Sequence, residues 1–245
     1  RRTKAEVLEE LPQKTEITIK VSMSPEETAL YENLRNNTLE NLASGEINSI
    51  QAMAALTKLR QAACNPKLVD AKLDIPSSKA SVFLELVKDL IANNHRALVF
   101  SQFTSHLALI KQVLDEAKIE YLYLDGSTPT SERKGLVEKF QTGLTPIFLI
   151  SLKAGGLGLN LTGADYVIHL DPWWNPAIED QASDRAYRIG QERAVTIYRL
   201  ITENTIEEKI IDLHLTKRSL ADALLEGADM SSKLSKEEIL KLLSV

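Results

Sequence analysis

The sequence predicts an α/β fold built on a parallel sheet with helices on both faces. Between residues 79 and 202, short apolar runs alternate with helical stretches, which is typical of parallel strands joined by helical crossovers. Helical patterns dominate before and after this segment, so we expect helical additions to flank the sheet. The 245 residues, 44% of them hydrophobic, can bury the substantial core that such a fold needs.

The first 78 residues predict one strand and two helices. Apolar and polar side chains alternate over residues 16–23, as they do in a half-buried strand. Ser24, Pro25 and Glu27 then supply an N-cap, a proline at the first helical position and the glutamate of a capping box, which together start a helix. The expected elements are a strand over 16–23, helices over 25–43 and 48–63, and a linker over 74–78.

The middle of the chain supplies the sheet. Its expected strands are the apolar runs at 97–100, 121–124, 147–150, 166–170 and 195–200. Helical stretches are expected between them at 105–117, 131–140 and 176–188. After residue 203 the pattern becomes helical again, with one helix opening at 205–208 and a short last one at 235–238.

Composition narrows the function classes without choosing one. The net charge of −5 weakens the case for nucleic acid as a partner but leaves it open, because a local groove needs only backbone amides and a few cations. No apolar run approaches the roughly 18 residues of a membrane span, so no membrane partner is expected. Cys64 has no disulfide partner, which fits a reducing, cytoplasmic environment, and the four scattered histidines predict no metal site.

A glycine-rich loop follows the expected strand at 147–150. Four of the ten glycines lie within residues 155–163. Glycines at the carboxyl end of a strand let backbone amides approach a ligand, and nucleotides bind at such ends in α/β proteins. A tight turn in an α/β protein without a nucleotide site explains the same residues, so the loop leaves both interpretations open.

Two arginines mark the helix expected at 176–188. Gln181, Arg185 and Arg188 would share one helical face, since residues three and four apart are neighbours. The stripe suited to the core consists of Ile178, Ala182, Ala186 and Ile189. Two planar guanidiniums on one edge suit a polyphosphate. The alternative is a surface ion pair between Asp184 and Arg188 that only supports the helix.

Both tryptophans lie side by side in Asp171-Pro172-Trp173-Trp174-Asn175-Pro176. Strand-like alternation would turn at most one of the two rings inward, so the other is expected at the surface as a contact residue. We expect the exposed ring to be that of Trp174. The alternative is that both rings pack under a loop.

In combination these motifs resemble the second half of the superfamily-two helicases, and within it the Swi/Snf branch. The segments that resemble helicase motifs are 97–103 (motif IV), 124–128 with Arg133 and Phe140 (the segment after it), 151–161 (motif V) and 181–191 (motif VI). Residues 1–14, 59–66 and 205–210 resemble the N-terminal segment, the helical protrusion and the start of the brace of that branch.

The resemblance implies three parts and a set of site residues. The parts are an N-terminal segment with a helical protrusion (1–78), a RecA-like helicase C-terminal lobe (79–202) and C-terminal brace helices (203–245). Arg185 and Arg188 would be arginine fingers, with Gln181 near the γ-phosphate of ATP. The implied nucleotide contacts are Gly156, Gly158 and Asn160, and the implied DNA contacts are Ser101, Gln102, Lys153 and Trp174.

The sequence lacks the phosphate loop that such an ATPase needs, because no G-x-x-x-x-G-K-[ST] occurs in it. By the resemblance, a first RecA-like lobe preceding Arg1 would hold ATP and Mg2+, and this chain alone would not hydrolyse ATP. The implied partners are double-stranded DNA, that first lobe and a DNA-bound protein to be displaced. The alternatives are a lobe of a strand-separating helicase and an isolated protein-docking module.

Overall fold

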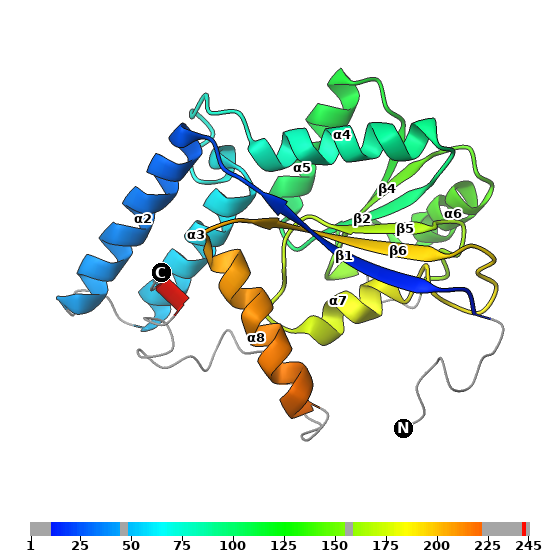
Figure 1. The fold of residues 1–245 in the computed structure, drawn as a ribbon. Helices are drawn as coiled ribbons and strands as arrows, with labels where there is room; N and C mark the ends of the chain where they lie inside the picture. Colours follow the sequence, from blue (N-terminus) through cyan, green and yellow to red (C-terminus); the bar gives the residue numbers. More distant parts are fainter. Residues whose placement is uncertain (1–10, 45–48, 155–158, 222–241, 244–245) are drawn as a thin grey trace. The chain divides into compact units, whose positions relative to one another are not determined.

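The computed structural model describes residues 11–44, 49–154, 159–221 and 242–243 (Figure 1). The chain divides into two compact units that alternate along the sequence. Unit 1 consists of Arg1–Ile19, Phe83–Asp171 and Ala177–Leu200, and unit 2 of Lys20–Val82, Pro172–Pro176 and Ile201–Val245. The predicted nucleotide contacts Gly156 and Gly158 and the helix expected at 235–238 lie outside the described residues.

The described elements follow the expected alternation of strands and helices. The strands are β1 (Lys14–Val21), β2 (Ala97–Ser101), β3 (Tyr121–Leu124), β4 (Ile147–Ser151), β5 (Tyr166–His169) and β6 (Val195–Thr202). The helices are α2 (Pro25–Ala43), α3 (Ser49–Cys64), α4 (Ser78–Ala92), α5 (Thr104–Glu116), α6 (Thr130–Gln141), α7 (Pro176–Ser183) and α8 (Ile206–Ala221), with a short 3-10 helix, η1 (Pro66–Leu68).

The strands form one six-stranded sheet in the order β1-β6-β5-β2-β4-β3. The pairs from β6 to β3 are parallel. β1 also runs parallel to β6, because the N–H of Val195 donates to the Gln13 carbonyl and the N–H of Glu203 to the Val21 carbonyl, both at 2.9 Å. Every side chain of the interior strands β2 and β4 is buried. The predicted parallel sheet is therefore confirmed.

Helices cover both faces of the sheet, as predicted. The connection from β2 to β3 crosses the sheet in one direction and the connection from β5 to β6 in the other. Because crossovers between parallel strands are right-handed, their helices α5 and α7 lie on opposite faces, as Figure 1 shows. This arrangement leaves the loops at the carboxyl ends of the strands free to carry function.

Unit 2 is a helical assembly with its own core. Its buried core residues are Tyr31, Leu42, Ala52, Leu56, Leu59, Ala62, Ala63, Trp174, Ile206, Ile210, Leu242 and Leu243. The predicted capping box at the start of α2 is present: the Ser24 hydroxyl accepts from the Glu27 N–H at 3.2 Å, and the Glu27 carboxylate accepts from the Ser24 N–H at 2.9 Å. Among the described residues, no helix combines the length and apolar character that crossing a membrane requires.

Two elements differ from the sequence prediction. β1 joins the sheet as its edge strand, and there only Val21 is fully buried, while Ile17 is 40% exposed. α4 (Ser78–Ala92) was not among the helices expected from the sequence. Its first N–H, that of Ser78, donates to the Glu27 carboxylate at 3.0 Å, so a residue distant in sequence caps this helix.

Candidate functional site

The carboxyl ends of β2, β4 and β5 gather at one edge of the sheet in unit 1. Ser101 ends β2, Ser151 ends β4, and the two residues are register partners. On the other side of β2, the N–H of Leu170 after β5 donates to the Phe100 carbonyl at 2.9 Å. Ligands of parallel α/β sheets bind at this kind of edge. The two loops with predicted DNA contacts, those after β2 and β4, therefore begin side by side.

Asp171 organises the loop that follows β2. Its carboxylate accepts from the Ser101 hydroxyl and, at 3.2 Å, from the N–H of Gln102. Ser101 is 1% exposed, so its hydroxyl is turned inward, which does not agree with the predicted direct contact to DNA. Gln102 is half-buried, whereas Lys153 in the loop after β4 is exposed. Of these three predicted contacts, Lys153 is thus the exposed one.

Trp174 is a core residue of unit 2, so the prediction that its ring is exposed is wrong. It is 4% exposed, and Trp173 is the half-buried member of the pair. The guanidinium carbon of Arg60 lies 5.1 Å from the Trp174 ring centre and 5.4 Å from that of Trp173. Arg60 also donates to the Pro172 carbonyl at 2.5 Å. The alternation of a strand does not apply, because β5 ends before the tryptophans.

The arginine-bearing segment is a turn and not a continuous helix. α7 ends at Ser183, so the prediction that the helix continues to Arg188 is wrong. Beyond the helix some hydrogen bonds change from four-residue to three-residue spacing: the N–H of Ala186 donates to the Ser183 carbonyl at 3.1 Å. The Arg185 carbonyl accepts from the N–H of Leu161 at 3.0 Å. This bond joins the turn to the end of the glycine-rich loop.

The Arg185 side chain in this turn is buried. It is 4% exposed, and its Nε and Nη1 have no hydrogen-bond partner among the described residues. Burial, and then the positive charge of Arg188, lower the pKa of the Arg185 guanidinium. A buried cation without acceptors is costly unless an anion pairs with it. The Arg185 guanidinium is therefore a candidate contact for an anion.

The other predicted catalytic and nucleotide-binding residues that the structure describes are exposed. Gln181 on α7 and Arg188 in the turn are exposed, and so is Asn160, the neighbour of the residue that bonds to Arg185. Ile189 is 67% exposed, so the predicted buried stripe does not extend to it. The structure thus joins Arg185 to Leu161, the residue after Asn160, whereas Gln181 and Arg188 do not share a helical face with Arg185.

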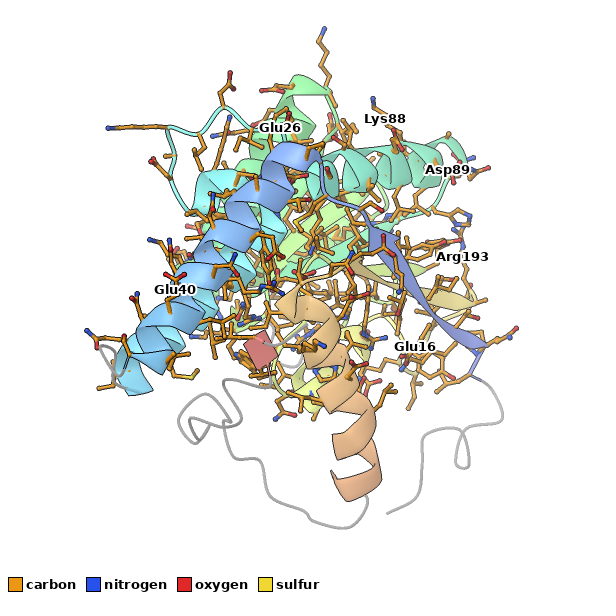
Figure 2. All side chains as sticks on the ribbon, turned by 60° about the vertical axis from the view of Figure 1, so that its left-hand side comes forward. Glu16, Glu26, Glu40, Lys88, Asp89 and Arg193 are labelled. Atoms are coloured by element: carbon orange, nitrogen blue, oxygen red, sulfur yellow. The ribbon has the colours of Figure 1, made fainter. Side chains whose placement is uncertain are left out.

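Sequence reasoning missed the polar contacts that hold α7 on the sheet. Arg199 of β6 donates to Glu179 of α7 at 2.9 Å and to Glu16 of β1 at 2.8 Å, and Figure 2 labels Glu16 on its strand. Burial would raise the pKa of Glu16, but Arg199 and a neighbouring lysine lower it to about 2. At the other end of α7, His169 Nε2 lies 2.9 Å from the Ser183 hydroxyl. The signal in the sequence that could have indicated these contacts is Arg199, a charged residue inside the apolar strand β6.

Two family descriptions match this chain. The helicase conserved C-terminal domain matches residues 78–190, and the SNF2-related domain matches residues 1–68. A protein of Mycoplasma pneumoniae described as an uncharacterised ATP-dependent helicase is 39% identical over 245 residues, which are 99% of this chain and 24% of that protein. The chain spans about a quarter of the length of the curated relatives that it matches first.

Solved structures extend the comparison to three dimensions. The C-terminal domain of the Sulfolobus solfataricus SWI2/SNF2 ATPase is 30% identical, with a TM-score of 0.76 over 95% of this chain and 100% of that one. The core of that ATPase in complex with double-stranded DNA is 33% identical, with a TM-score of 0.78 over 99% of this chain and 53% of the other. Both likenesses extend over nearly the whole chain.

Proposed function

Because this chain belongs to the SWI2/SNF2 (Swi/Snf) family of helicase-like ATPases, we propose that it is the second RecA-like lobe of an ATP-dependent motor that moves along double-stranded DNA. ATP and its Mg2+ are held by a first lobe of the same polypeptide, which also closes over the arginine-bearing turn. The exposed Ile189 suits such a contact between lobes, since an isolated apolar side chain at this surface gains from being covered.

The observation that carries the proposal is the guanidinium of Arg185, which is 4% exposed and has two donors without partners among the described residues. Leaving a buried donor unpaired costs about 1–3 kcal/mol, more when it is charged. The γ-phosphate of ATP offers several oxygen acceptors to the planar fork of an arginine. Binding of the nucleotide would thus satisfy two donors that have no partner among the described residues.

Arg185 acts on the charge that develops as the phosphoryl group is transferred. Arginine fingers contribute about 10³–10⁵-fold, or roughly 4–7 kcal/mol of barrier, to such reactions. Arg185 is buried and Arg188 exposed, so the field of Arg185 is screened less by water. Arg185 therefore provides the larger part of the effect, while Arg188, Gln181 and Asn160 line the rim of the nucleotide site.

DNA runs along the edge formed by the carboxyl ends of β2 and β4. Lys153 provides a phosphate contact and Gln102 a polar one, whereas Ser101 holds the loop through Asp171. The net charge of −5 limits the number of phosphate contacts. The affinity of the chain for DNA is accordingly low, independent of base sequence and reduced by salt.

Steady-state ATPase kinetics of the full-length protein with DNA tests the proposal. Arg185→Ala should lower kcat on the order of 10³-fold, because the interaction is realised mainly in the transition state. Arg185→Lys should not restore it, because an ammonium cannot reproduce the fork. Arg188→Ala should cost less, and Lys153→Ala should raise the DNA concentration needed for half-maximal stimulation.

Arg193→Ala is the matched control for removal of an arginine. Arg193, labelled in Figure 2, lies before β6 and pairs with Asp165 at 3.3 Å, with a side chain that is 64% exposed. Its loss should leave kcat unchanged. The 245-residue chain alone should show no ATP turnover. Turnover by this chain that survives repurification and disappears in Arg185→Ala would contradict the half-motor proposal, and so would an unchanged kcat of full-length Arg185→Ala.

A further inference from the structure

The side chain of Gln191 lies at the centre of a hydrogen-bond cluster in unit 1. It is 6% exposed, and its Nε2 lies within hydrogen-bonding distance of three carbonyl oxygens. These belong to Thr162 at 3.1 Å, Ala164 at 2.8 Å and Ala186 at 3.0 Å. Its Oε1 accepts from the N–H of Arg193 at 2.9 Å. Both ends of the carboxamide are therefore engaged, although the role proposed above for this lobe does not use it.

The cluster joins two segments of unit 1, the end of the glycine-rich loop and the arginine-bearing turn. Thr162 and Ala164 belong to the end of the glycine-rich loop, and Ala186 belongs to the arginine-bearing turn. The Arg185 carbonyl accepts from Leu161 of the same loop at 3.0 Å. The carbonyls of two successive residues in the turn are thus connected to one loop. The Arg185 carbonyl bonds to the loop directly, and the Ala186 carbonyl is connected to it through the Gln191 amide.

Gly190 explains how Gln191 reaches this position. The N–H of Gln191 donates to the Arg188 carbonyl at 2.9 Å, which closes a four-residue turn. Gly190, third in that turn, has φ of +93°, in the left-handed region that a type II turn requires at this place. A Cβ atom added here would meet no atom within 4 Å, so the requirement is one of backbone conformation and not of space.

We infer that Gln191 is a positioning residue for Arg185: its carboxamide fixes the arginine-bearing turn against the glycine-rich loop, so that the guanidinium is set in place before the nucleotide arrives. The part of this inference that concerns catalysis rests on the proposed function. The part that concerns the turn does not, since it follows from hydrogen bonds within unit 1. A misplacement of about 1 Å can cost on the order of 100-fold in rate, so the clamp would matter without touching ATP.

Gln141, the last residue of α6, provides a matched control. Its Oε1 accepts from the N–H of Gly163 at 2.8 Å, and its Nε2 donates to the Thr162 hydroxyl at 3.3 Å. Gln141 therefore holds the same loop from another side. Its hydrogen bonds within the described residues go to the loop and not to the turn. Loss of Gln141 should loosen the loop and leave Arg185 in place.

Hydrogen exchange of the 245-residue chain tests the clamp without any activity. Gln191→Ala should speed amide exchange at least about tenfold in both the loop (159–164) and the turn (184–188), because local opening exposes amides in proportion to its population. Gln141→Ala should speed exchange in the loop alone. Unchanged exchange of the turn in Gln191→Ala would overturn the inference.

Kinetics of the full-length protein with DNA tests the catalytic part. Gln191→Ala should lower kcat on the order of 100-fold, with KM for ATP changing less than about threefold. Gln191→Glu should have the same effect, because it keeps the size of the side chain but removes the N–H donors of the carboxamide. In an Arg185→Ala background the same changes should add no further loss, because Gln191 acts through Arg185. Gln141→Ala should keep its kcat.

Multiplicative losses in the double variants, or an unchanged kcat in Gln191→Ala, would overturn the catalytic part of the inference. An unchanged kcat in Arg185→Ala alone would instead contradict the proposed function, and the exchange result would still decide whether Gln191 holds the turn. A purely structural Gln191 would lower stability and kcat together, with equal effect in the presence and absence of Arg185.

Discussion

The ion pair between Lys79 and Glu207 offers a sharp test of how unit 2 is held together. Each side chain is 1% exposed, and Lys79 Nζ lies 2.7 and 2.6 Å from the two carboxylate oxygens. Glu207 also accepts from the N–H of Thr202 at 2.8 Å. Lys79→Met keeps the length of the side chain and removes its charge. It should cost about 3–5 kcal/mol of unfolding free energy, because the glutamate charge is left buried without its counterion.

Urea unfolding followed by circular dichroism measures this cost. With a slope near 3 kcal/mol per molar urea, the transition midpoint of Lys79→Met should fall by more than about 1 M. Lys79→Met combined with Glu207→Gln should regain most of the loss, since a neutral amide oxygen can still accept from Thr202. Lys20→Met is the control: Lys20 pairs with Glu208 at 3.2 Å but is 63% exposed, so its loss should cost less than about 1 kcal/mol.

A Lys79→Met midpoint close to the wild-type value would refute the reasoning, and so would a double variant as unstable as the single one. The first result would mean that Glu207 reaches water or another cation when Lys79 is lost. The second would mean that the cost comes from packing around the methionine and not from an uncompensated charge. Both outcomes can be distinguished from the expected one with the same three variants.

Two further predictions concern buried aromatic and imidazole groups. Trp174→Ala should lower the unfolding free energy by about 3–5 kcal/mol through loss of core packing and of the Arg60 contact. Trp173→Ala should lower it less, because Trp173 is only half-buried. Thermal unfolding of the two variants measures the difference. Burial lowers the pKa of His169 to about 4. As the pH falls, the histidine is therefore protonated in the unfolded chain before it is protonated in the folded one. The free energy of unfolding should fall by about 2 kcal/mol from about pH 7.5 to about pH 5. Urea titrations at both pH values should show that His169→Gln lacks this decrease.

Short sequence patterns predicted the helices and strands whose ends are set by residues next to them in the sequence. The helix expected over 25–43 is α2 with the same bounds, because the capping box at Ser24 and Glu27 sets its start from within four residues. The strand at 121–124 was likewise predicted with its final bounds. α4 was missed although a local signal is present, since the Ser77 hydroxyl accepts from the N–H of Ala80 at 3.2 Å. The second cap, the Glu27 carboxylate on the N–H of Ser78, comes from a distance, and no pattern near Ser78 records it.

The site was predicted in its residue types but not in its geometry. Gln181, Arg185 and Arg188 have helical spacing, and a continuing helix would have used the Arg185 carbonyl to accept from Ile189. In the structure that carbonyl accepts from Leu161 instead. Tertiary hydrogen bonds thus end α7 after Ser183, and the spacing of residues within the segment could not reveal them.

Replacing the helix by a turn changes what the two arginines can do. On a helical face they would have been equivalent, both long cations reaching from the surface to one phosphate. In the turn, Arg185 is buried and Arg188 exposed, and the positive charge of Arg188 disfavours the charged form of Arg185. Keeping a buried arginine close to a second positive charge is unfavourable, so the backbone of the turn has to be rigid to hold it there. The Gln191 clamp and the turn at Gly190 supply that rigidity, so the residues that follow the arginines matter to the proposed chemistry as much as their spacing does.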